Sequence, residues 1–244
     1  MILSIRRCAL LLVSLGAAAC GNHSVPSGPP NFTGLWQVAD TNLTIKPEDD
    51  PTLLTDEGLR RKRESAANFD AERDSADAFC VPHGMPWIML SRARDYLTDI
   101  YQTKDRITLL LEGMDVHRLV RFDQGLVPDT FQPSTNGYSL GHWEADTLVI
   151  ETTHLRATNP AGRYQRSEQM KVTERWRLIN HPKFGRALEL QVEALDPVLY
   201  RHVGRGYQLY VAAPPGSVLN AYGCAESRFD DHINELRKKP GHEN

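Results

Sequence analysis

Apolar and polar residues alternate along most of the chain after residue 96, which is typical of β-strands that bury one face. Residues 96–103, 106–112 and 116–122 are three such runs, separated by only two or three residues. Links this short predict consecutive antiparallel strands. An earlier strand is predicted at residues 31–36, and later ones at residues 139–143, 147–153, 170–179, 186–195 and 207–212.

The region between the first strand and this series has a different pattern. Residues 53–77 are rich in charge, and Leu59, Ala66 and Phe69 recur at helical spacing. We therefore predict one early amphipathic surface helix that begins near Thr55 and exposes a charged face. The whole pattern predicts a mainly β fold, a closed or nearly closed antiparallel barrel of about nine or ten strands. A β-sandwich is the alternative architecture.

Two charged residues interrupt the apolar faces of the predicted strands. Glu174 lies between Val172 and Trp176 on the inward face of one strand, and Arg118 lies on the inward face of another. An isolated charge is costly to bury, so these two side chains are candidates for a buried ion pair. The pair either forms a satisfied salt bridge in the core or faces a ligand. A bulge that turns Glu174 outward is a further alternative.

The first residues have the pattern of an export signal. Arg6 and Arg7 precede a short apolar run, and the small residues 16–19 precede Cys20. The apolar run is shorter than the about 20 residues that cross a bilayer. We expect residues 1–19 to be a signal peptide, Cys20 to carry a lipid as in a bacterial lipobox, and residues 20–30 to form a flexible tether. Ordinary signal cleavage, which would leave Cys20 as a free thiol, is the alternative.

These segments define the expected domains and location. A barrel domain is expected at residues 31–230 and a polar tail at residues 231–244. The protein would face the bacterial periplasm, and the outer membrane is favoured because Gly21 offers no obvious inner-membrane retention signal. Without Arg6 and Arg7, 26 of the 28 basic residues remain against 31 acidic ones. No basic face stands out, so no nucleic-acid partner is expected.

The cysteines remaining after this assignment form an even pair. Cys8 leaves with the signal and Cys20 is the expected lipid site, so Cys80 and Cys224 remain. Such a pair in an exported protein favours a disulfide. Closing so long a loop would stabilise the fold by about 4 kcal/mol in the chain-entropy model.

Several motifs resemble, in the right order, those of a large group of exported bacterial proteins usually labelled hypothetical. Residues 137–153 (GYSLGHWEADTLVIETT) are similar to the group's signature GxSxGxWEGDTLVVETT. The other similar motifs are C-x-P-x-G-x-P at residues 80–86, VTERFR at 172–177, DPxxY at 196–200 and C-x-E at 224–226.

The chain departs from this group at two points. Ala145 replaces the usual Gly of the signature, and Val203 with Gly204 replaces a Pro-Trp pair. The first change suggests a different hairpin turn, and the second suggests an altered wall of any pocket. Because the group resembles lipocalin-like barrels in its strand pattern, the resemblance implies export and a lipocalin-like barrel. It implies no particular activity.

Catalytic motifs are weak in this sequence. The G-x-S-x-G match at residues 137–141 is followed by a predicted hairpin, whereas a nucleophile elbow leads into a helix. The nine histidines show no metal-binding spacing, so we expect no metal and no cofactor. Glu174 together with His83, His142 or Tyr138 would supply an acid and a base for chemistry without a cofactor.

Three hypotheses about function follow. The first is an exported lipoprotein that binds a small hydrophobic or aromatic molecule inside the barrel, with candidate ligand-binding residues Arg118, Tyr138, Trp143, Trp176 and Tyr200. The second is a periplasmic lyase or isomerase that uses Glu174, His83 and His142 on such a molecule. The third is an envelope scaffold without a pocket. The expected partners are a small hydrophobic molecule and, through the lipid, a membrane; protein partners stay open.

Overall fold

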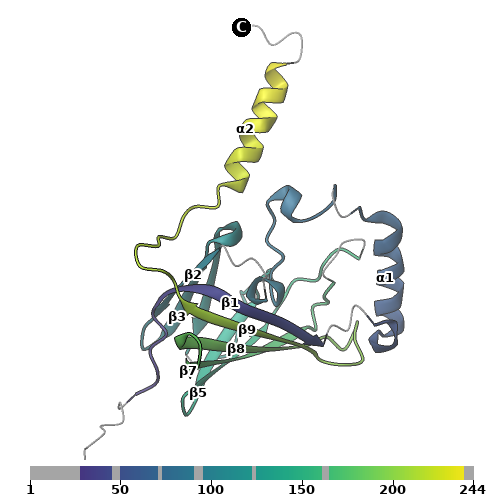
Figure 1. The fold of residues 1–244 in the computed structure, drawn as a ribbon. Coiled ribbons are helices and arrows are strands. Elements are labelled where there is room, and N and C mark those ends of the chain that lie inside the picture. Colours follow the sequence, from purple (N-terminus) through teal and green to yellow (C-terminus); the bar gives the residue numbers. More distant parts are fainter. Residues whose placement is uncertain are drawn as a thin grey trace, which may run out of the picture.

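The computed structural model describes residues 28–45, 50–70, 73–90, 96–122, 125–160 and 165–238, with only the backbone at residues 43–45. The predicted signal peptide, Cys20, most of the tether and the last six residues lie outside this part of the chain. The described residues form a closed barrel of nine strands in sequence order (Figure 1). The strands are β1 (Gly34–Ile45), β2 (Leu97–Gln102), β3 (Arg106–Leu111), β4 (Val116–Arg121), β5 (Tyr138–Glu144), β6 (Thr147–Thr153), β7 (Lys171–His181), β8 (Gly185–Leu195) and β9 (Gly204–Ala212).

The predicted fold class is confirmed. All nine predicted runs form strands, and closure of the sheet excludes the β-sandwich. The early helix is α1 (Asp56–Asn68), and the described chain also contains a late helix, α2 (Cys224–Arg237). Helix α2 has no counterpart among the predicted elements, and it crosses the domain boundary suggested at residue 230.

One pair of strands differs from the expected antiparallel arrangement. Eight of the nine neighbouring pairs are antiparallel, but β4 and β5 run parallel. A ring with an odd number of strands cannot alternate direction throughout, so one parallel pair is unavoidable. This seam is short, because only Val120 with Ser139 and Arg121 with Leu140 are in register.

Helix α1 begins where its sequence predicts and packs closely on the barrel. The Thr55 hydroxyl accepts a hydrogen bond from the Gly58 N–H at 3.0 Å, and the acidic Asp56 and Glu57 suit the positive end of the helix dipole. A Cβ atom on Gly58 would lie 2.2 Å from the Leu199 carbonyl oxygen. Only glycine therefore allows this close contact between α1 and the segment after β8.

The segment before β1 closes one end of the barrel. Phe32 is buried, and its ring lies 5.3 Å from the ring of Trp143. Its N–H donates to Gln102 Oε1 and its carbonyl accepts from Trp36 Nε1, both at 2.9 Å. These contacts hold Phe32 across the opening at this end.

Loops and α1 cap the other end, and two buried charges hold the cap together. Arg166 donates to the carbonyl oxygens of Arg156 and His83, both at 2.8 Å. Burial lowers its pKa to about 10. Asp196 accepts from the N–H of Ser167 at 2.6 Å and from its hydroxyl at 2.8 Å. The buried apolar residues of the cap include Leu54, Met85, Met89, Leu155, Met170 and Leu199.

Residues 213–223 connect β9 to α2 along the side of the barrel. Glu112 accepts from the Asn220 N–H at 3.0 Å and from the Leu97 N–H at 2.8 Å, and Asp115 accepts from the Tyr222 N–H at 2.9 Å. Two acidic residues beside the turn between β3 and β4 thus fix this connection.

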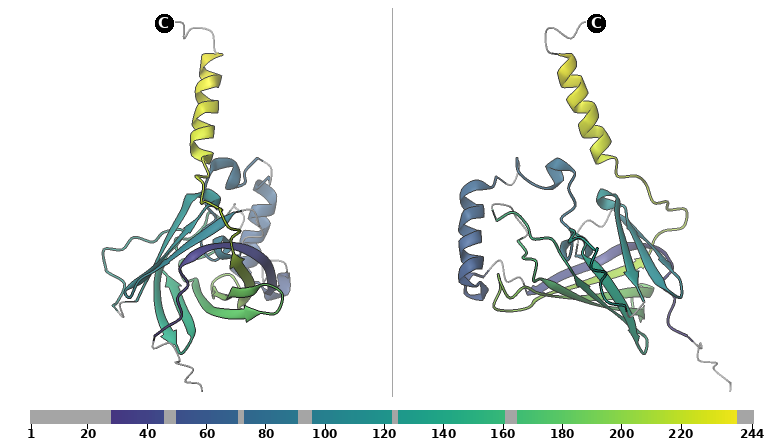
Figure 2. Two further views of the ribbon diagram at one scale, coloured as in Figure 1. Left: turned by 60° about the vertical axis from the view of Figure 1, so that its left-hand side comes forward. Right: turned by 180° about the vertical axis from the view of Figure 1, so that it is seen from behind.

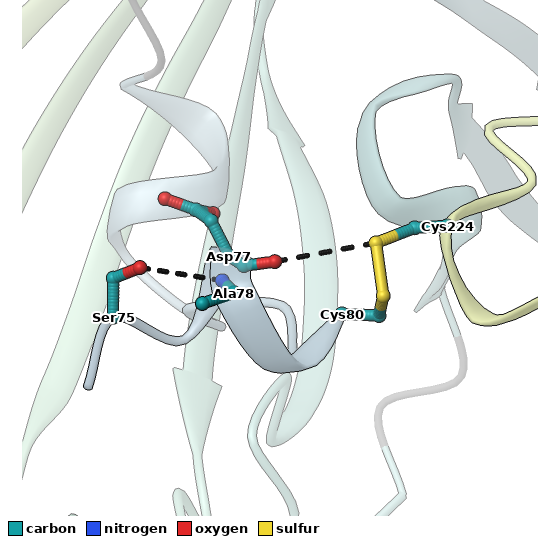
Figure 3. Close-up of a disulfide and its surroundings, with 5 residues drawn as sticks. All are labelled: Ser75, Asp77, Ala78, Cys80 and Cys224. Carbon is teal, nitrogen blue, oxygen red and sulfur yellow. Dashed lines mark hydrogen bonds between the residues drawn. A yellow bond between two sulfur atoms is a disulfide. The ribbon is translucent and has the colours of Figure 1, made fainter. Parts of the chain in front are cut away.

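A disulfide then fixes the first residue of α2. Cys80 and Cys224 are bonded, with Cα atoms 5.6 Å apart, as the cysteine count predicted (Figure 3). The Cys224 sulfur also lies 4.0 Å from the Asp77 carbonyl oxygen, a contact without a hydrogen bond because a disulfide sulfur carries no hydrogen. Beyond this bridge, α2 projects away from the barrel (Figures 1 and 2).

Candidate functional site

The strand register brings a set of polar side chains together inside the barrel. Alternation along β5, β6 and β7 turns Ser139, Thr152 and Glu174 inward, where all three are buried. Ser139 lies directly opposite Thr152, and Glu174 lies opposite Ile150, the next inward residue of β6. Arg118 reaches the same place from β4, across the short parallel seam.

Arg118 and Glu174 form the buried ion pair that the sequence predicts. The guanidinium contacts both carboxylate oxygens: Nη1 lies 3.0 Å from Oε1, and Nη2 bonds to Oε2. Nη2 also donates to Ser139 Oγ at 3.1 Å and Thr152 Oγ1 at 3.0 Å. Arg118 is 3% exposed and Glu174 is 0% exposed. A bidentate pair with this support is geometrically specific as well as neutral overall.

Further polar groups face the same interior from β7 and β9. Gln208 Nε2 lies 2.9 Å from the Tyr210 hydroxyl, and the Tyr210 ring stacks on Trp176 at 5.6 Å and 17°. Burial raises the pKa of Tyr210, so its hydroxyl stays uncharged at physiological pH. The charges of Arg118 and Glu174 also act on this hydroxyl. The ion pair and the Gln208–Tyr210 pair therefore lie in the same part of the interior.

Three buried atoms of this interior have no hydrogen-bond partner within the described residues. They are the donors Arg118 Nε and Trp176 Nε1 and the acceptor Gln208 Oε1. Each belongs to a side chain that is at most 3% exposed. A buried polar group left unpaired costs about 1–3 kcal/mol, so a core with only a structural role would tend to avoid these three.

The candidate ligand-binding residues separate into two groups. Arg118 and Trp176 lie in the interior, together with Glu174. The other three lie elsewhere. Trp143 packs at the end closed by Phe32, Tyr138 lies beneath Phe131 on the outer side of β5, and Tyr200 belongs to the cap, where its hydroxyl donates to the Gln165 carbonyl at 3.0 Å.

The two histidines proposed for acid–base chemistry lie in other parts of the molecule. His142 is exposed on the β5–β6 hairpin, with Nε2 3.3 Å from Glu144 Oε1. His83 lies in the cap beside the disulfide, with Nε2 3.3 Å from Asp77 Oδ1. The predicted acid–base set is thus distributed over three places, and Arg118 occupies both oxygens of Glu174.

Four interior residues were missed by the sequence analysis. Ser139, Thr152, Gln208 and Tyr210 are buried polar residues on inward faces. The signal that would have found them is the one that found Glu174, because each occupies the parity of buried neighbours along its strand.

The described residues offer no metal-binding cluster and no membrane-spanning helix. Within the described ranges, no cluster of three or more His, Cys, Asp or Glu residues is arranged to hold a metal ion. Among the described helices, none is long and apolar enough to span a bilayer. No protein-family model and no curated protein gives a significant match to this chain. The fold and interior therefore define a closed β-barrel protein with a buried polar cluster.

Proposed function

We propose that this protein is an exported lipoprotein that binds a small, mainly apolar or aromatic molecule inside its barrel. The observation that carries the proposal is the set of three unpaired polar atoms on Arg118, Trp176 and Gln208. A ligand with one hydrogen-bond donor and either two acceptors or one oxygen that accepts from both donors would satisfy them, while its apolar body contacts the surrounding core. Barrels of this size are able to enclose one small ligand.

The charges of the interior favour an uncharged ligand. Arg118 and Glu174 neutralise each other, and Tyr210 is held in its neutral form. A charged guest would enter this low-dielectric interior without a free counter-charge, at a large cost. The same pairing supports binding over lyase or isomerase chemistry, because Arg118 occupies both carboxylate oxygens of Glu174 and leaves neither facing a substrate alone.

The proposed location rests on the N-terminal pattern and on the disulfide. A bridge between Cys80 and Cys224 fits an oxidising compartment such as the periplasm. Lipid attachment at Cys20 would place the native chain in the membrane fraction, from which Cys20→Ser should release it. Equal distribution of both forms in the soluble fraction would contradict the anchor while leaving the proposed ligand untouched.

The binding proposal is tested with a co-purified ligand and with two matched probes. Native mass spectrometry of the protein purified from its own periplasm should show a defined adduct that denaturation releases. In titrations of delipidated protein, the neutral dye N-phenyl-1-naphthylamine should bind saturably. Its relative 1-anilinonaphthalene-8-sulfonate has the same ring system but carries a negatively charged sulfonate. It should therefore not compete for a site that accepts only uncharged molecules.

Two variants locate the site of probe binding. Gln208→Met removes the unpaired acceptor Oε1, which would take the N–H of the neutral dye, so it should weaken binding of this dye by about fivefold to tenfold, the worth of one hydrogen bond. Trp143→Phe is the control at the end closed by Phe32 and should change the affinity little. Absence of both an adduct and saturable binding would overturn the proposal and favour an envelope scaffold.

A further inference from the structure

Helix α2 carries an apolar stripe that the described chain leaves uncovered. Phe229 is 63% exposed and Ile233 is 36% exposed, although both are large apolar side chains. The helix stands clear of the barrel in all three views of Figures 1 and 2. Ala225 and Leu236 continue the stripe, because residues three or four apart share one helix face.

A helix in this position needs a partner to be stable. It has 14 residues, and isolated helices shorter than about 12–15 residues are marginal in water. Gly223 at its N-cap provides no side-chain hydrogen bond. The Cys80–Cys224 bridge holds only the first residue of α2. Coverage of the stripe by another surface would supply the missing stabilisation.

The charged residues beside the stripe indicate which surface would cover it. At 100° per residue, Glu226 and Arg237 fall within about 20° of each other on the same edge of the stripe. One is near the start of the helix and the other is at its end. Two copies of this edge placed antiparallel would bring each acidic residue opposite a basic one. Placed parallel, they would not.

We propose that α2 pairs antiparallel with α2 of a second copy of this protein, independently of any ligand in the barrel. The twofold axis crosses the helix pair at the level of residues 231 and 232, so that Phe229 of one copy lies between Ile233 and Leu236 of the other. Glu226 then faces Arg237 of the second copy, and the reciprocal pair forms by symmetry. Since α2 projects away from its own barrel, the two barrels lie at opposite ends of the helix pair.

Other partners fit the helix less well. Helix α2 carries four acidic residues (Glu226, Asp230, Asp231 and Glu235) against Arg228 and Arg237, whereas a helix that lies on an anionic membrane is rich in Lys and Arg. The edge that carries Glu226 and Arg237 complements the same edge of a second copy, whereas binding of an unrelated protein would not require this match. Two stripes of this length bury less than a standard interface of about 1,200–2,000 Å², so we expect a dimer that forms in the micromolar range or above.

The test is sedimentation velocity of the full exported chain carrying Cys20→Ser, over concentrations from about 5 to 300 µM. We expect a reversible monomer–dimer equilibrium that Phe229→Asp abolishes. Because α2 does not build the barrel core, the thermal unfolding midpoint of the barrel should stay unchanged and exclude misfolding as the cause.

Charge reversal tests the antiparallel register. Glu226→Arg sets like charges opposite each other at both ends of the pair and should weaken dimerisation about tenfold. Adding Arg237→Glu restores opposite charges and should restore the dimer. Asp231→Arg, the control, makes the same change of charge on the far face and should have little effect. A monomer at every concentration, a dimer insensitive to Phe229→Asp, or no rescue by the double reversal would each overturn the proposal.

Discussion

The interior of the barrel and the cap at its end each bury one arginine, and the two are held in different ways. Arg118 is 3% exposed and pairs with Glu174, so its charge is compensated by another full charge. Arg166 is 2% exposed and donates to backbone carbonyl oxygens of Arg156, His83 and Met85. Within the described residues, no carboxylate forms an ion pair with Arg166.

The difference shows two ways of burying the same group. In the barrel, strand geometry fixes the positions of both partners, and a carboxylate can be placed opposite the cation. In the cap, irregular backbone leaves carbonyl groups that need donors, and a long guanidinium satisfies several of them at once. Partial dipoles compensate less than a carboxylate, which is why burial lowers the pKa of Arg166 to about 10.

The largest expected effect comes from breaking the compensated pair. Glu174→Gln leaves Arg118 as an unpaired buried charge and should lower the free energy of unfolding by about 3–5 kcal/mol, measured by urea denaturation. The double variant Arg118→Met, Glu174→Met removes both charges and should be less destabilising than Glu174→Gln alone. A loss below about 1 kcal/mol in the single variant would show that the pair is not energetically coupled.

A smaller and more local effect is expected in the cap. Arg166→Met leaves buried carbonyl oxygens without donors and should cost about 1–3 kcal/mol. Hydrogen exchange should become faster near His83 and Met85 while the barrel strands stay protected. The exposed neighbour Arg156→Met is the control and should change neither quantity. Faster exchange throughout the barrel would contradict a role confined to the cap.

The smallest effect concerns a buried anion that, like Arg166, has neutral partners. Burial alone would raise the pKa of Glu112, but hydrogen bonds from Leu97 and Asn220 outweigh it and leave the pKa below the ordinary value of 4.5. A lowered carboxylate pKa stabilises the fold above the unfolded value, and this contribution is lost as the pH falls through the folded value.

Acid should therefore release the connection between β9 and α2. Hydrogen exchange at the Asn220 and Tyr222 amides should accelerate as the pH falls below 4.5, after correction for the intrinsic rate. Glu112→Gln should show the accelerated exchange already at neutral pH. If the corrected rates in the native protein were independent of pH, Glu112 would not hold this segment.

Much of the barrel could be predicted because strand alternation is a local signal. The positions of Glu174 and Arg118 on inward faces followed from their apolar neighbours, and Thr55 marked the start of α1. The parallel seam was missed because it follows from the number of strands in the closed ring. Helix α2 was missed because its sequence lacks a capping side chain and a wide apolar face.

The site was predicted only where one strand revealed it. Glu174 and Arg118 stand out against apolar neighbours, whereas Gln208 and Tyr210 look like ordinary members of a short strand. Their importance depends on what lies across the barrel, including Trp176 two strands away. Arg166 and Asp196 lie in irregular segments, where no periodicity shows which side chains turn inward.

The short seam between β4 and β5 also bears on how this chain tolerates changes in length. Only two residues of each strand are in register there, and the connection between the strands includes the strongly exposed Leu126. Loop closure becomes costlier only slowly as a loop lengthens. Insertions between residues 125 and 130 should therefore disturb the barrel least, which makes this connection the natural place for length variation among relatives and for grafting a foreign peptide.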